Sequence, residues 1–288
     1  SRVMSTATCV RPAAAADREA GEVLALRPGR IQLRRATSDP ALRYYTWVHP
    51  QPRPDAPWLV AVHGISRDPR EQIRLLQPAA AAAGVSLVAP RFDAGRFPGY
   101  QRLGLTGTGA RSDQALLAIL DDLRAVGGAG PHVDLFGFSG GAQFAHRFAL
   151  LHPHVVRRLV LAAAGWYTLP DPARPYPHGV ASPAGTALPG FRPDSFLRIP
   201  QLVLVGAEDR QRDGALRTGR RLDREQGRHR LARAIHWTRH LRGLARRHGI
   251  DTGRCRLQVL PRTGHSFEEA VRNGGLDRHV IRFLQEQE

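Results

Sequence analysis

The chain has no lysine and only two cysteines, and these shortages exclude several classes of protein. Cys9 and Cys255 are too few for a disulfide framework or a four-thiolate zinc site. No run of about 18 apolar residues occurs, so a membrane-spanning helix is not expected. Hydrophobic residues make up 42% and charged residues 23% of the 288 residues. The chain can therefore form a sizeable core and is not a disordered polymer.

Because lysine is absent, all 42 basic residues are arginine, and the formal net charge is +17. A protein that binds nucleic acid or a membrane surface usually gathers its positive charge on one face. Here arginine is spread from Arg2 to Arg282. We interpret the bias as compositional, so no specific nucleic-acid partner and no membrane partner are expected. An arginine-driven nucleic-acid binder, the weakest alternative, predicts steeply salt-dependent retention on DNA.

Residues 1–25 predict a poorly ordered N-terminal extension ahead of a single domain over residues 26–288. Four charged residues between positions 11 and 19 interrupt the alanine-rich stretch, so no signal peptide is visible. Two unpaired thiols agree with a cytoplasmic location. Secretion is the alternative, if a leader peptide has been removed from the N-terminus.

Short apolar runs alternate with helix-like segments, which predicts an α/β fold with a mostly parallel central sheet flanked by helices. Asp68 as N-cap, Pro69 at the first position and Gly84 just past the end bound the first of these helices. The strands are expected at residues 58–62, 85–89, 132–136, 159–163, 201–205 and 256–260, and the helices at residues 69–83, 112–126 and 143–151.

Two segments depart from this rhythm. Residues 165–200 are rich in proline and glycine, with little periodicity, and are expected to form an irregular lid or insertion. Residues 214–248 are expected to be helical and strongly basic. We interpret the arginines of the basic helix over 228–248 as a solvated face, with a binding surface as the alternative; they are Arg228, Arg230, Arg233, Arg239, Arg242 and Arg246.

A glycine-flanked serine, Ser139 in Gly137-Phe138-Ser139-Gly140-Gly141, lies between a predicted strand and a predicted helix. A serine at such a sharp turn adopts strained backbone angles, and small neighbours let the chain fold back. The turn exposes the hydroxyl at the carboxyl edge of the sheet and places the Gly140 amide at a helix N-terminus, where an oxyanion can be stabilised. Ser139 is therefore the candidate nucleophile, and a glycine-rich turn without chemistry is the alternative.

A carboxylate and a histidine follow the last two predicted strands. Asp209 ends the sequence Gly-Ala-Glu-Asp after one strand, and His265 lies in Thr-Gly-His-Ser-Phe after the other. A serine nucleophile needs an imidazole to take its proton, and the imidazole needs a carboxylate to fix its tautomer. Because the carboxyl ends of parallel strands meet at one edge, Ser139, His265 and Asp209 are expected to come together. Glu208 and Asp213 remain alternatives for the acid.

An earlier strand ends in His63-Gly64-Ile65, and the Ile65 amide is the candidate for a second oxyanion donor. We expect His63 to shape this loop rather than to act as the base. The aromatic residues near the site can bind an apolar acyl or aryl group, or can pack beneath a lid. No cluster of histidine, cysteine and aspartate has metal-ligand spacing, so no metal or organic cofactor is expected. The residues expected around the substrate pocket are His63, Phe97, Tyr100, Phe138, Trp166 and Tyr167.

From about residue 55 onward, these motifs and their order resemble the α/β-hydrolase superfamily, particularly its serine esterases and lipases, with polyester depolymerases among the relatives. Serine at the elbow excludes the dehalogenases and epoxide hydrolases, which use aspartate, and the dienelactone hydrolases, which use cysteine. The resemblance implies that Ser139 is the nucleophile, Asp209 the acid and His265 the base. It also implies that the amides of Ile65 and Gly140 form the oxyanion hole.

The resemblance implies hydrolysis of carboxylic esters through an acyl-enzyme intermediate. The expected substrate is a small-molecule ester, with the chain ends of a polyester as one candidate. The first alternative is an amidase, peptidase or acyltransferase with the same three residues. Leaving-group preference in an activity panel would distinguish these enzymes from an esterase. A noncatalytic α/β-hydrolase scaffold used for binding is the second, which failure to react with an organophosphonate would favour. The sequence does not predict the oligomeric state.

Overall fold

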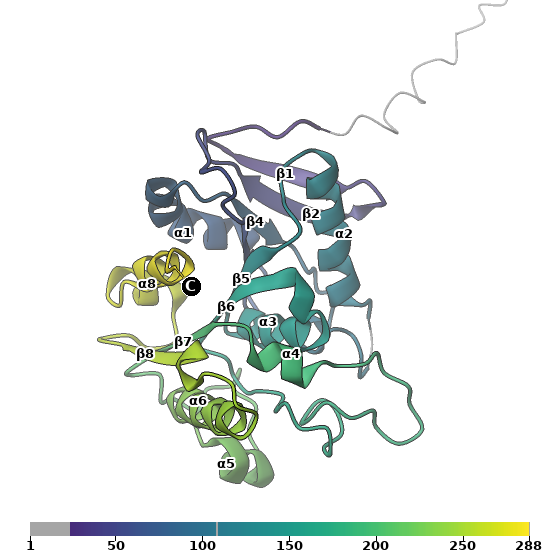
Figure 1. Ribbon diagram of the computed structural model, residues 1–288, viewed down its shortest axis with the longest axis vertical. Coiled ribbons are helices and arrows are strands. Elements are labelled where there is room, and N and C mark those ends of the chain that lie inside the picture. Colours follow the sequence, from purple (N-terminus) through teal and green to yellow (C-terminus); the bar gives the residue numbers. More distant parts are fainter. Residues whose placement is uncertain (1–23, 108, 288) are drawn as a thin grey trace, which may run out of the picture.

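A computed structural model describes residues 24–107 and 109–287 of the chain. The predicted extension at residues 1–25 therefore lies, up to residue 23, outside the described residues. An eight-stranded sheet runs through the middle of the molecule, and helices cover both of its faces (Figure 1). Within the described ranges, none of the helices combines the length and apolarity that a bilayer span requires.

The sheet is mostly parallel, as the sequence predicts. Its strands are β1 (Ile31–Ala36), β2 (Asp39–Trp47), β3 (Leu59–Val62), β4 (Leu87–Pro90), β5 (Val133–Phe138), β6 (Val156–Ala162), β7 (Gln201–Gly206) and β8 (Cys255–Leu260). They lie in the order β1-β2-β4-β3-β5-β6-β7-β8. The pairs from β4 to β8 are parallel, and β1–β2 and β2–β4 are antiparallel. All six predicted strands are present, and the antiparallel pair is an addition to the prediction.

Two groups of helices bury the two faces of the sheet. The helices are α1 (Pro69–Ala83), α2 (Ser112–Ala125), α3 (Gly140–Leu151), α4 (Pro193–Leu197), α5 (Arg220–Gln226), α6 (Arg230–Arg247), α7 (Phe267–Arg272) and α8 (Leu276–Leu284). One hydrophobic core contains residues of α1, α7 and α8, and the other contains residues of α2, α3, α4 and α6. Figure 1 shows α1 and α8 on one side of the sheet and α2, α3 and α4 on the other.

Helix α1 has the predicted bounds, because the signals at both of its ends are local. The Asp68 side chain accepts a hydrogen bond from the Glu71 amide, and Pro69 begins the helix. Gly84 ends it with φ 72°, a left-handed conformation that favours glycine. The helix predicted at 143–151 instead begins at Gly140, directly after Ser139.

The basic segment 214–248 differs from the prediction in two ways. It forms two helices, α5 and α6, separated at Gly227, whose φ of 117° is incompatible with a continuous helix. The interpretation of its arginines as a solvated face is wrong for Arg230 and Arg233, which are 1% and 0% exposed. Both are buried because each guanidinium pairs with an aspartate distant in sequence, Asp213 or Asp223.

Candidate active site

Ser139 lies at the tight turn between β5 and α3, with φ 56° and ψ −115°. A non-glycine residue with these angles is strained, and the surrounding backbone must hold it in place. The Ser139 amide donates to the carbonyl of Ala162 at 2.8 Å. Glycine is required on both sides because the backbones touch. A β-carbon at Gly137 would lie 2.1 Å from the Gly141 carbonyl oxygen, and one at Gly141 would lie 2.1 Å from that of Val62.

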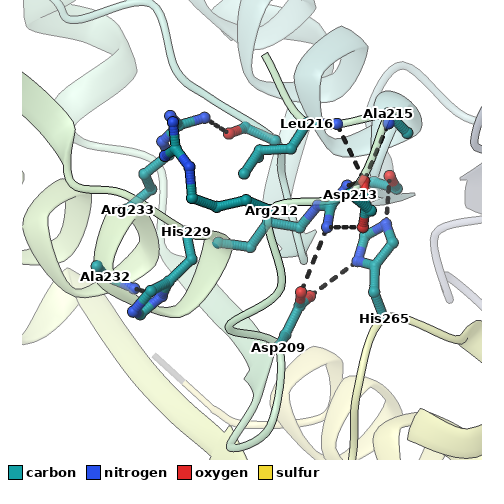
Figure 2. A network of polar contacts seen from close by, with 12 residues as sticks. Asp209, Arg212, Asp213, Ala215, Leu216, His229, Ala232, Arg233 and His265 are labelled. Carbon is teal, nitrogen blue, oxygen red and sulfur yellow. Dashed lines mark hydrogen bonds and ion pairs between the residues drawn. The ribbon is translucent and has the colours of Figure 1, made fainter. Parts of the chain in front are cut away.

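The three predicted residues meet at the carboxyl edge of the sheet in one hydrogen-bonded chain. Ser139 Oγ lies 2.9 Å from His265 Nε2, and His265 Nδ1 lies 2.8 Å from Asp209 Oδ2. Figure 2 shows the His265 ring and the Asp209 carboxylate pointing toward one another. The Asp209 side chain is fully buried, whereas that of His265 is 20% exposed. With Nδ1 donating to the carboxylate, Nε2 is free to accept the proton of the serine hydroxyl.

Asp213, one of the two alternative acids, has a different partner. Its carboxylate binds Arg230 through two hydrogen bonds of 2.7 and 3.0 Å. This contact, more than any other, lowers the pKa of Asp213 to about 2. Asp213 also accepts from the amides of Ala215 and Leu216 (Figure 2). Among the described carboxylates, Asp209 is the one bonded to His265.

Arg230 is a residue of this site that the sequence analysis missed. Its Nη1 atom lies 3.5 Å from Asp209 Oδ1, on the carboxylate oxygen that does not face His265. The same guanidinium anchors Asp213 at the start of the 213–217 loop. One signal was present in the sequence: Arg230 directly precedes Leu231, an apolar residue at the start of the basic helix.

The His265 ring is supported on its flat side by the residue before the nucleophile. Phe138 stacks on His265 with ring centroids 5.4 Å apart and planes at 25°. Phe138 in turn packs against Phe267 at 5.2 Å. Because Phe138 and Ser139 are adjacent in the chain, this packing sets the imidazole beside the hydroxyl.

The two predicted oxyanion donors flank Ser139. Gly140 is the first residue of α3, where amides have no acceptor within the helix. Ile65 follows Gly64, which lies against the nucleophile: a β-carbon at Gly64 would lie 3.5 Å from Ser139 Cβ. The Ile65 side chain is 59% exposed at the cleft.

His63 is fully buried behind this loop. The Phe92 amide donates to His63 Nε2 at 3.0 Å, so the ring proton is on Nδ1, which donates to the Gly64 carbonyl at 2.8 Å. The Tyr100 hydroxyl donates to the His63 carbonyl at 3.0 Å. Burial lowers the pKa of His63 to about 4. These contacts fit the predicted role of shaping the loop.

A cleft of about 770 Å³ opens beside Ser139 and His265, and it is lined by Phe138 and Trp166, as expected. Four residues expected around the pocket do not line it, because their side chains pack against other rings and backbone inside the protein. The rings of Phe97 and Tyr100 surround Phe92, and Tyr167 stacks on Trp237 at 4.6 Å. The four residues are His63, Phe97, Tyr100 and Tyr167.

The segment 165–200 is irregular apart from α4, but it does not form a lid over this cleft. All of it is described, and only Gly165 and Trp166 line the cleft. The remainder is held against α3 and its neighbours: Arg147 donates to Thr168 Oγ1 at 2.8 Å, and Tyr176 donates to the Arg102 carbonyl at 2.6 Å. Of the two forms predicted for this segment, a lid or an insertion, the structure therefore shows an insertion, and the cleft walls come from the 98–107 and 214–217 loops.

No group of three or more histidine, cysteine, aspartate or glutamate side chains in the described part of the chain is placed to hold a metal ion. The cleft does contain charged residues that the sequence analysis did not single out, namely Glu71, Arg102 and Arg217, besides Arg230.

No family model and no curated protein matches the chain. Solved structures do. Poly(aspartic acid) hydrolase-1 from Sphingomonas sp. KT-1 is similar with a TM-score of 0.70 and 24% identity, over 85% of this chain and 94% of that one. LpqC, a poly(3-hydroxybutyrate) depolymerase from Bordetella parapertussis, has a TM-score of 0.68 and 27% identity, over 84% and 88%. FphF, a fluorophosphonate-binding serine hydrolase from Staphylococcus aureus, has a TM-score of 0.58 and 12% identity, over 90% and 100%.

These likenesses confirm the fold predicted from the motifs. The likeness to LpqC, at 27% identity, also supports a hydrolase.

Proposed function

Starting from the α/β-hydrolase fold, we propose that this protein is a serine esterase that cleaves carboxylic esters through an acyl-enzyme intermediate. The observation that carries the proposal is the hydrogen-bonded chain Ser139–His265–Asp209, in which the serine has strained backbone angles and opens onto a cleft. A hydroxyl, an imidazole and a buried carboxylate in this order are the arrangement that activates a serine nucleophile.

In the proposed mechanism, Ser139 Oγ attacks the ester carbonyl carbon while His265 Nε2 takes the hydroxyl proton. The buried Asp209 carboxylate stabilises the imidazolium through Nδ1. The amides of Ile65 and Gly140 bind the oxyanion of the tetrahedral intermediate. His265 then gives its proton to the departing alcohol. In the second half, His265 activates a water molecule that releases the acyl group from Ser139.

The test of the activated serine is reaction with a fluorophosphonate, followed by intact-mass analysis and peptide mapping. We expect a single adduct on Ser139, and none in Ser139→Ala. Ser66 also lines the cleft, so Ser66→Ala is the matched control, and it should still be labelled. Absence of an adduct in folded wild-type protein would overturn the proposal in favour of a binding scaffold, and an adduct on another serine would overturn the assignment of Ser139.

Amide hydrolysis is the second candidate, because the chain is similar to a protein named as a hydrolase of poly(aspartic acid), a polyamide. The matched pair p-nitrophenyl acetate and p-nitroacetanilide shares the acyl group and differs in the bond cleaved. The proposed esterase hydrolyses the first and leaves the second essentially intact. Turnover of the anilide at a comparable kcat/KM would establish the amidase instead.

For the substrate class, we propose short oligomeric esters in addition to small esters. The support is an open cleft of about 770 Å³, together with the similarity to a poly(3-hydroxybutyrate) depolymerase. Release of soluble hydroxy acid from dispersed oligomers, absent with Ser139→Ala, is the expected result. Hydrolysis of aryl esters without any release from oligomers would restrict the enzyme to small substrates.

A further inference from the structure

Three arginines surround the indole of Trp166, which lines the cleft. The guanidinium carbons of Arg147 and Arg217 each lie 4.6 Å from the ring centroid, and that of Arg102 lies at 5.5 Å. Trp166, Arg102 and Arg217 line the cleft together with Ser139, whereas Arg147 lies fully buried behind them. Cation–π contact holds the arginine side chains in place but does not neutralise them.

This cluster has no acidic counterpart. Among residues 24–107 and 109–287, no carboxylate forms an ion pair with Arg102, Arg147 or Arg217. Arg147 donates to Thr168 and to the Gln101 carbonyl, while its Nη2 atom is buried without a hydrogen-bond partner. Burial, and then the charges of the other two arginines, lower the pKa of Arg147 to about 10.

The other cleft arginine provides a contrast. Arg230 also lines the cleft, but its charge is balanced by Asp213 and Asp209. Of the three arginines in the cluster, Arg147 is fully buried, Arg102 is half-buried and Arg217 is exposed. Holding like charges together around a buried one without a counterion costs free energy, so a cluster of this kind is favoured when a ligand supplies the anion. Guanidinium groups bind carboxylates particularly well, since their planar donors can form two parallel hydrogen bonds.

We propose that Arg102 and Arg217 form a subsite for a carboxylate of the substrate, which makes the enzyme selective for esters that carry a free acid group. The proposal rests on the proposed esterase activity of Ser139. The subsite adjoins the reaction centre along the chain: Arg102 follows Gln101, and a β-carbon at Gly140 would lie 3.3 Å from Gln101 Cγ. The substrates that fit are half-esters of dicarboxylic acids and the acid-terminated ends of hydroxy-acid oligomers.

Two matched pairs of esters test the subsite. p-Nitrophenyl hydrogen adipate carries the carboxylate on the acyl part, and p-nitrophenyl adipamate is its neutral counterpart. γ-Acetoxybutyrate carries it on the alcohol part, with γ-acetoxybutyramide as counterpart. At low ionic strength we expect kcat/KM to be roughly tenfold higher for the anionic member of at least one pair. This factor corresponds to a contact stronger than an exposed ion pair and weaker than a buried charge-assisted hydrogen bond. Added salt should reduce this preference.

The Arg102→Gln/Arg217→Gln double variant should bring the anionic-to-neutral ratio close to one. Arg239→Gln removes the same kind of charge from the exposed side of α6 and is the control, which should keep the wild-type ratio. If the double variant does not fold, Arg217→Gln at an exposed position replaces it, with an expected loss of roughly threefold in the ratio. A wild-type ratio near one in both pairs, or a ratio that the substitutions leave unchanged, overturns the subsite.

A binding experiment separates this outcome from failure of the esterase proposal. Monomethyl adipate and dimethyl adipate are titrated into Ser139→Ala, with tryptophan fluorescence as the readout. The subsite is supported if monomethyl adipate binds more tightly than dimethyl adipate, and if this difference disappears when Arg102→Gln and Arg217→Gln are added to Ser139→Ala. This result supports the subsite even if no ester is hydrolysed. Equal binding of the two compounds refutes the subsite, even if the fluorophosphonate labels Ser139.

Discussion

Replacing His63 tests whether the imidazole behind the loop of the proposed oxyanion donor Ile65 is buried in its neutral form. In the folded protein the Phe92 amide donates to His63 Nε2, and Nδ1 donates to the Gly64 carbonyl. Protonation of Nε2 would remove the acceptor for the Phe92 amide and place a charge in a fully buried site. His63→Asn removes the titrating group while keeping one donor and one acceptor at this position.

The magnitude follows from the shift in the pKa. Burial lowers the pKa of His63 from 6.5 to about 4, so between these values the unfolded chain binds a proton that the folded chain does not. The free energy of unfolding is therefore complete above the unfolded pKa and falls as the pH falls toward about 4. From about pH 7.5 to about pH 5, this one group accounts for a loss of about 2 kcal/mol.

The assay is urea unfolding of wild type and His63→Asn at a series of pH values. The variant is expected to be less stable overall, but the difference between the two curves carries the test. Above about pH 7 the curves should run parallel, and toward pH 5 the wild type should lose about 2 kcal/mol more than the variant. Equal losses in the two proteins would refute the buried neutral histidine. Contributions from other buried histidines, such as His146, are present in both proteins and cancel.

Three further substitutions test the site. Asp209→Asn should lower kcat for aryl esters by about 10³ to 10⁴ because it loses the correct imidazole tautomer, whereas Glu208→Gln should stay near wild type in the same assay; equal effects would reassign the acid. Gly141→Ala should lower the melting temperature strongly or prevent folding, since its β-carbon meets backbone at 2.1 Å, while Gly190→Ala, with open space around it, should not. Arg230→Met should lower the free energy of unfolding in urea by about 2 kcal/mol, which is less than for a fully buried pair because Asp213 is partly exposed. The same variant should also have a lower kcat, and an unchanged kcat would contradict the contact of Arg230 with the acid Asp209.

The parts of the fold that sequence predicted well are those fixed by local chemistry. The cap at Asp68 and the left-handed Gly84 predicted the bounds of α1, and short, mostly apolar runs predicted the six parallel strands. The antiparallel pair β1–β2 was not predicted because its strands mix apolar residues with polar and charged ones and contain no continuous apolar run. The order of Ser139, Asp209 and His265 predicted their meeting, since three parallel strands end at one edge of the sheet.

Side-chain direction was the main limit on predicting the cleft. Trp166 and Tyr167 are adjacent, yet the first lines the cleft and the second stacks on Trp237 in the core. Their position after β6 indicated that both lie near the site but not which way each points, because that depends on partners from α6. Phe97 and Tyr100 failed as pocket residues for the same reason, as their rings enclose Phe92.

The arginines show why an even spread of charge along the sequence does not mean an even role in the structure. Arg230 and Arg233 were grouped with exposed neighbours, but each is buried against carboxylates more than nine residues away in sequence. A lysine at either position would offer a single ammonium where a guanidinium makes several bonds at fixed angles: Arg233 alone contacts two carbonyls through Nη1, a third through Nε and Asp223 through Nη2. Arg102 and Arg217 differ from these, since no carboxylate of the described chain balances them. The same residue type therefore tethers the loops of the site in one place and leaves charge unbalanced at the cleft in another, and the unbalanced pair is the one open to a substrate.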